Sequence, residues 1–212
     1  WEPVALPPRP AYQPDMIAAA AQMLTRASNP LIMVGGGATH ATQDIRAIAE
    51  CLGAIVTAST AGKGIVPDDH PLSLSAGVVT KDGHNIISSA DVILAVGTEL
   101  AETDSFAGAL HIPGQIIRVD IDPLKLSDQH PATIGIVSDA AIAMAALKDA
   151  CAGHVEQIST KNTAIVAATK AAIMSKLNAS EKQHSRLLQL MRGCLSDHAI
   201  ISNDACQIAY TG

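Results

Sequence analysis

Short apolar runs, each followed by a turn rich in small or polar residues, alternate with helical patterns along much of the chain. The runs are apolar at most positions rather than at alternate ones, which predicts strands covered on both faces. Strands that alternate with helices form a parallel sheet, because each crossover helix returns the chain to the same edge. The pattern therefore predicts an α/β fold, a parallel sheet with helices on both faces. Strands are expected at residues 31–34, 54–58, 92–96, 115–119 and 133–137.

Helical patterns lie before the first run, between some of the runs and after the last one. In residues 42–52 the apolar side chains recur three and four positions apart, and Gly53 provides a stop. Asp15 is expected to cap a helix that ends before Asn29, because the residue before a proline is pushed out of the helical region. A short helix is expected at residues 82–90, and Asp139 is expected to cap another that runs to residue 150.

Small and polar residues gather where the expected strands end. In an open parallel sheet, ligands bind outside the carboxyl ends of the strands. Glycines let a backbone approach a phosphate or a ring closely, and exposed amides at a following helix start attract anions. A carboxylate after a strand can also accept hydrogen bonds from ribose hydroxyls. These features predict a dinucleotide-type cleft that contains Gly35, Gly36, Gly37, Thr60, Gly62, Lys63, Gly97, Thr98, Asp120 and Asp122.

Each of these signals also has a purely structural interpretation. Residues 35–37 do not match the GxGxxG pattern, so a packing turn is favoured over a phosphate loop. Lys63 can pair with a phosphate or remain a solvated loop lysine. Asp120 and Asp122 can bind ribose or shape the turn before Pro123, since aspartate favours such turns. From the residues alone, both interpretations of the lysine and the aspartates stay open.

Composition disfavours several other classes of protein. Aromatic residues make up 2% of the chain, and the net charge of −6 comes without a run of Lys or Arg, which argues against nucleic acid and anionic membranes as partners. No apolar stretch approaches the roughly 18 residues of a membrane span. The histidines lack metal-ligand spacing, so no metal site is expected, and neither a GxSxG elbow nor a P-loop occurs. Four separated cysteines without a CxxC pair indicate a reduced, cytoplasmic setting.

The ends of the chain differ in character from its middle. Five prolines in residues 1–14 favour an extended linker, and residues 15–150 hold the α/β pattern. Residues 151–182 are polar, rich in alanine and helix-prone, as in a helical linker. A further unit is expected over residues 183–212, with a helix ended by Gly193 and a strand that starts at residues 199–201. The chain opens without Met and stops after a strand-like run, so we expect a piece of a longer polypeptide; a trimmed small protein is the alternative.

Taken in order, the motifs resemble those of thiamine-diphosphate-dependent enzymes of the acetolactate synthase and 2-oxoacid decarboxylase type. Residues 6–10 are similar to the linker that leaves the first domain of these enzymes, and residues 60–72 (TAGKGIVPDDHPL) resemble the most recognisable segment of the central domain. The likeness extends over nearly the whole chain, and its other segments are residues 29–38, 90–98, 117–123 and 202–207.

The resemblance implies a Rossmann-like central domain of the NAD/FAD-binding type, followed by the start of the domain that binds thiamine diphosphate. In the family, the first domain supplies a glutamate that activates the thiamine ring, and a Gly-Asp-Gly motif in the third holds Mg²⁺ and the diphosphate. The central domain binds FAD, ADP or CoA-like ligands in some members and nothing in others. Active sites lie between paired subunits, which implies a homodimer or homotetramer, and the substrate is a small 2-oxoacid.

The sequence departs from the family pattern at two points. It contains neither the first domain nor a Gly-Asp-Gly motif, so no catalytic residue or magnesium ligand can be named and the chain alone is expected to be inactive. Residues 97–104 also lack the arginine and the Asp-Asp run typical of acetolactate synthases, which argues against FAD. The alternative from a different class is a stand-alone regulatory module that binds FAD, NAD or ADP.

Overall fold

The computed structural model describes residues 8–106, 110–153, 160–196, 199–202, 204 and 206–211. The chain divides into two compact units, Trp1–Lys170 and Ala171–Gly212, which we describe separately. Among the described residues, every helix is too short or too polar to cross a membrane.

The first unit is built on a parallel sheet of five strands, as the sequence predicts. Each strand lies within one residue of its expected position at either end. The strand order is β2-β1-β3-β4-β5, so β1 lies between β2 and β3, with Leu31 opposite both Ile55 and Ile93. The chain therefore leaves β1 toward one edge and later returns to its other side. The strands are β1 (Pro30–Val34), β2 (Ile55–Ala58), β3 (Val92–Val96), β4 (Gln115–Asp120) and β5 (Ile134–Val137).

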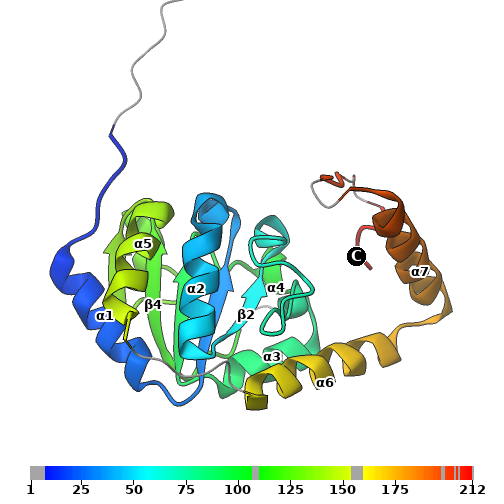
Figure 1. Cartoon of the computed structure of the whole chain (residues 1–212), viewed down its shortest axis with the longest axis horizontal. Coiled ribbons are helices and arrows are strands. Elements are labelled where there is room, and N and C mark those ends of the chain that lie inside the picture. The colour runs from blue at the N-terminus through cyan, green and yellow to red at the C-terminus, as the bar shows by residue number, and fades with distance from the viewer. Residues whose placement is uncertain are drawn as a thin grey trace, which may run out of the picture. The chain divides into compact units, whose positions relative to one another are not determined.

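Helices cover both faces of this sheet (Figure 1). One face packs against α1 (Pro14–Arg26), α2 (Thr42–Leu52) and α5 (Ala140–Cys151), with α5 between the other two. The other face packs against α3 (Lys81–Ser89) and the buried Val166 of α6 (Thr160–Lys176). All five residues of β1 and of β3 are buried, which explains their continuously apolar sequences.

The predicted helix ends are confirmed in part. Gly53 ends α2 in the left-handed conformation (φ 61°), and the Asp139 carboxylate accepts hydrogen bonds from the first amides of α5. Asp15 was expected to cap α1, but that prediction is wrong, because Gln13 is the cap and Pro14 begins the helix. Proline suits the first helical position, since its φ is already helical and its missing N–H is not needed there.

The second unit contains the end of α6 and the helix α7 (Ala179–Cys194). Asn178 and Glu181 form a reciprocal capping box at the start of α7. Gly193 lies in its last turn rather than beyond it. The strand expected at residues 199–201 is wrong: these residues pair with no described strand, and Ile200 is 94% exposed. An apolar β-prone run forms a strand only when a neighbouring strand takes up its hydrogen bonds.

Glycines bring the turns after β1 and β3 into backbone contact. A Cβ at Gly35 would lie 2.2 Å from the carbonyl oxygen of Gly97, and a Cβ at Gly97 would lie 2.5 Å from the carbonyl carbon of Gly37. Gly97 also has a φ of +54°, which other residues adopt at a cost. The close contacts of Gly35 and Gly37 with the turn after β3 agree with the packing interpretation. The two turns meet where the strand order reverses, between β1 and β3.

We predict that Gly97→Ala lowers the free energy of unfolding by at least about 2 kcal/mol, because the methyl group collides with Gly37 and the backbone stays at positive φ. Urea unfolding followed by circular dichroism measures the change. Gly193→Ala is the control, since its added Cβ would contact nothing within 4 Å, and we expect it to leave stability unchanged or slightly raised. Equal stability of the two variants would contradict the packing argument.

Candidate functional site

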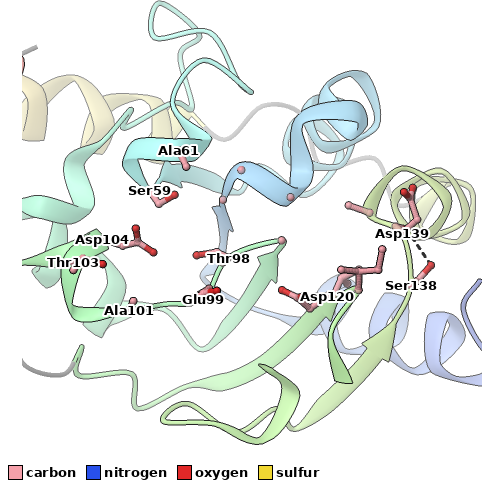
Figure 2. A pocket seen from close by; sticks show the side chains of 17 residues that line it. Ser59, Ala61, Thr98, Glu99, Ala101, Thr103, Asp104, Asp120, Ser138 and Asp139 are labelled. Atoms are coloured by element: carbon pink, nitrogen blue, oxygen red, sulfur yellow. Dashed lines mark hydrogen bonds between the residues drawn. The ribbon is translucent and has the colours of Figure 1, made fainter. Parts of the chain in front are cut away.

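A pocket of about 510 Å³ lies at the carboxyl ends of the strands in the first unit (Figure 2). The residues that line it come from the turns after all five strands. Two of these turns begin short helical segments, η1 (Gly36–Ala41) after β1 and η2 (Thr60–Gly62) after β2, and α4 (Glu102–Ser105) follows β3. The pocket therefore occupies the position where open parallel sheets bind ligands.

Six of the ten predicted site residues line this pocket. The turn after β1 forms one part of the wall, the turn after β3 another, and the end of β4 supplies a carboxylate. The six residues are Gly35, Gly36, Gly37, Gly97, Thr98 and Asp120.

The other four predicted residues do not line the pocket. Thr60 begins η2, and a Cβ at Gly62 would lie 2.2 Å from the carbonyl oxygen of Val34, so Gly62 serves packing. The Nζ atom of Lys63 lies 3.4 Å from the carboxylate of Asp68. Asp122 caps η4 (Pro123–Ser127) by accepting a hydrogen bond from the amide of Leu124. For Lys63 and Asp122, the structural interpretation agrees with these positions.

Several lining residues were missed by the sequence interpretation. Ser138 and Asp139 follow β5, and Asp139 was considered only as a helix cap. Applying the strand-end rule to the fifth strand would have identified both residues, because all parallel strands end at one edge. The remaining missed residues lie in the turns and short helices at this edge, at the end of β4 or at the start of α5: Ser59, Ala61, Glu99, Ala101, Thr103, Asp104, Val119, Ile121 and Ala140.

The charged side chains that line the pocket are all acidic. Four acidic residues line it, Glu99, Asp104, Asp120 and Asp139, and in Figure 2 they extend from Asp104 at one side to Asp139 at the other. Burial raises the pKa of the Asp104 carboxyl above its usual value, and the negative charge of Glu99 raises it further. The pocket is therefore suited to hydrogen-bond donors and positive charge.

The carboxylates do not form a metal centre. Among the residues that the structure describes, no three His, Cys, Asp or Glu side chains are grouped so that they could hold a metal ion. Asp120 and Asp139 instead accept hydrogen bonds from nearby amides, those of Asp122 and of the start of α5.

A buried arginine supports the turn after β3. The Arg118 side chain is 1% exposed, and its guanidinium donates to the carbonyl oxygen of Thr98 (3.1 Å), to that of His130 (3.1 Å) and to the Asp128 carboxylate. These bonds tie β4 to the end of β3 and to the loop before β5. Thr98 lines the pocket, so Arg118 holds one wall of the pocket in position.

We predict that Arg118→Met lowers the free energy of unfolding by about 3 kcal/mol, because it leaves two carbonyl groups without their donor and the Asp128 carboxylate without its partner. Urea unfolding provides the measurement. Arg46→Met is the matched control: Arg46 forms an exposed pair with Glu50 on α2, and we expect a loss below about 0.5 kcal/mol. A loss at position 118 no larger than at position 46 would contradict the supporting role.

We predict a loss of stability in acid that depends on His130. Burial and the charge of Arg118 lower the pKa of His130 below its ordinary value of about 6.5. The folded chain therefore keeps this imidazole neutral where the unfolded chain binds a proton, so stability falls as the pH drops below about 6.5. In His130→Gln we expect the urea midpoint to decrease less between pH 7.5 and pH 5.5, both chosen to bracket about 6.5. The same decrease in both proteins would show that other groups cause it.

Several known proteins are similar to this chain in sequence and in fold. The family model of the thiamine pyrophosphate enzyme central domain matches residues 17–147. A probable 2-ketoarginine decarboxylase of Pseudomonas aeruginosa is 36% identical over 198 residues, which cover 93% of this chain and 35% of that protein. The glyoxylate carboligase of Escherichia coli O157:H7 is 29% identical over 159 residues, or 69% of this chain and 26% of the carboligase.

Solved structures agree with the sequence comparison. The crystal structure of benzoylformate decarboxylase from Polynucleobacter necessarius superposes with a TM-score of 0.58 at 26% identity, covering 76% of this chain and 30% of that one. The chain thus spans about a third or less of the length of these relatives. The family model accounts for α1 to α5 and for the sheet around which the pocket is built. The chain belongs to the family of thiamine pyrophosphate enzyme central domains.

Proposed function

We propose that this chain works as the central part of a thiamine-diphosphate-dependent enzyme that makes or breaks a carbon–carbon bond next to the carbonyl group of a 2-oxoacid. The match of the family model to residues 17–147 carries the proposal. The names of the relatives support it, since they describe a decarboxylase and a carboligase. The setting is cytoplasmic, in keeping with four cysteines that form no CxxC pair.

The division of labour follows from what the chain contains. When bound, thiamine diphosphate supplies an electron sink for the bond that breaks. The described residues offer no metal cluster, and the sequence has no Gly-Asp-Gly motif, so they do not fit Mg²⁺ or the cofactor diphosphate. No catalytic step is therefore assigned to this chain. Its role is to hold the flanking domains and a second copy in position, within a homodimer or homotetramer.

The domain limits are part of the proposal. Residues 1–14 form the linker from a preceding domain, residues 15–150 the central domain, residues 151–182 a helical linker and residues 183–212 the start of the cofactor-binding domain. The similarity to the Pseudomonas protein covers 93% of the chain, which supports one enzyme as the origin of all four segments. The two compact units divide within α6, inside the proposed helical linker.

Decarboxylation is favoured over acetolactate synthesis. The turn after β3 and the start of α4, residues 97–104, contain no arginine and no Asp-Asp pair. The relative that covers 93% of the chain is named a probable 2-ketoarginine decarboxylase. We propose 2-ketoarginine as the first substrate to test, followed by pyruvate, glyoxylate and benzoylformate.

A nucleotide-binding module is the second candidate. The pocket at the strand ends motivates it, since Gly35, Gly97 and Asp120 line that pocket. This candidate requires specific binding of FAD, NAD or ADP and a native polypeptide of about this length. The enzyme proposal requires neither.

We expect that an antibody raised against this chain will capture, from the source cells, a polypeptide considerably longer than 212 residues. Peptide sequencing should find a Gly-Asp-Gly motif after residue 212. The captured protein should release CO₂ from a 2-oxoacid only when thiamine diphosphate and Mg²⁺ are present, because the cofactor carries the chemistry. The 212-residue chain expressed alone is the control and should be inactive. A native chain of this length, or activity of the control, would overturn the proposal.

A further inference from the structure

We infer that the pocket at the strand ends excludes the diphosphate group of FAD and ADP, although it occupies the nucleotide position of the fold. A diphosphate site needs positive charge, free amide donors or a metal ion. The inference concerns only the first unit and holds whether or not the proposed function is correct.

The first requirement is positive charge, which the pocket lacks. All 14 Lys and Arg residues of the chain lie in the described segments, and none of them lines the pocket. Two approach its edge, but each is paired with a lining carboxylate. Lys125 lies 3.1 Å from Glu99, and Arg9 lies 3.5 Å from Asp139. Asp104 and Asp120 have no such ion pair among the described residues, so a diphosphate would meet uncompensated negative charge.

The second requirement is free amide donors at the strand ends. After β1, the amides of Gly35 and Gly37 donate to the carbonyl oxygens of Val96 and Gly97, at 3.0 and 3.1 Å. The hydrogen bonds that accompany the packing of the two turns thus use both amides.

The ends of three other strands, β2, β3 and β5, show the same pattern. After β2 the amide of Ser59 donates to Val34, and after β3 the amide of Gly97 donates to Val119, both at 2.9 Å. After β5 the amide of Ser138 donates to Asp120 at 3.0 Å. An amide that already donates to a carbonyl group is not available to a phosphate oxygen.

The start of α5 is a further anion-attracting feature at the pocket. A helix N-terminus favours a phosphate because its first amides lack partners. Here the Asp139 carboxylate accepts from the amides of Ala141 and Ile142, at 3.0 and 3.3 Å. The side chain of Asp139 thus takes the place that a phosphate would need.

The third requirement, a metal ion that bridges carboxylates and phosphate, is tested directly by experiment. The described residues contain no cluster that would hold one. Isothermal titration of the full chain with ADP, with and without Mg²⁺, should give no saturable binding up to about 1 mM. The purified protein should also show no flavin absorbance after incubation with FAD.

A charge-reversal variant shows whether charge is the cause. Glu99→Arg places a cation at the pocket, and we expect it to bind ADP at least about tenfold more tightly than the unchanged chain. The matched control is Asp149→Arg, the same change of charge on an exposed residue at the far end of α5, which should not bind ADP.

Two results would overturn the inference. The first is saturable binding of ADP or FAD by the unchanged chain, with or without Mg²⁺. The second is equal ADP affinity for the Glu99→Arg and Asp149→Arg variants, because charge at the pocket would then have no influence. Since none of these measurements involves thiamine diphosphate or a 2-oxoacid, they leave the enzyme proposal untouched whichever way they turn out. The expected absence of binding would count against the second candidate, the nucleotide-binding module.

Discussion

The backbone contact between the turns after β1 and β3 is the constraint on which the first unit depends. A side chain at Gly35, Gly37 or Gly97 would collide with the opposite turn at 2.9 Å or less. The contact lies between β1 and β3, where the strand order reverses, so it sets the distance between the carboxyl ends of these two strands. Both turns line the pocket, so the same contact fixes the position of this part of the pocket wall. Arg118 secures the next part of the wall by joining the carbonyl oxygen of Thr98 to the loop before β5.

Local signals explain how much of the fold could be predicted from the sequence. Five largely apolar runs form five parallel strands, and Gly53 and Asp139 lie at helix ends as expected. Two predictions, the strand at residues 199–201 and the cap at Asp15, are wrong for the same physical reason. A local sequence pattern does not show which residues or strands lie beside it. Residues 199–201 have strand character but no strand beside them. Asp15 is a good cap, but Pro14 starts the helix before it.

The candidate site was predicted less completely than the fold. Six of the predicted residues line the pocket, because the strand-end rule depends only on where strands end. The direction of a side chain depends on tertiary partners that the sequence does not display. Lys63 turns to Asp68, and Asp122 turns to the amide of Leu124. Asp139 contributes to the pocket and to the start of α5 at once, and the sequence pattern indicates only the second role.

A glycine-rich turn at a strand end can either favour or prevent the binding of an anion. Where the glycines let amides point outward, the turn binds phosphate. Where they let two turns press together, the amides donate to the facing carbonyl groups and are lost to any ligand. Gly35 and Gly37 show the second arrangement, since the contact with Val96 and Gly97 uses both amides. The fold thus keeps the position of a nucleotide cleft, while the hydrogen bonds that hold its strand ends together occupy several of the amides that could otherwise donate to a diphosphate.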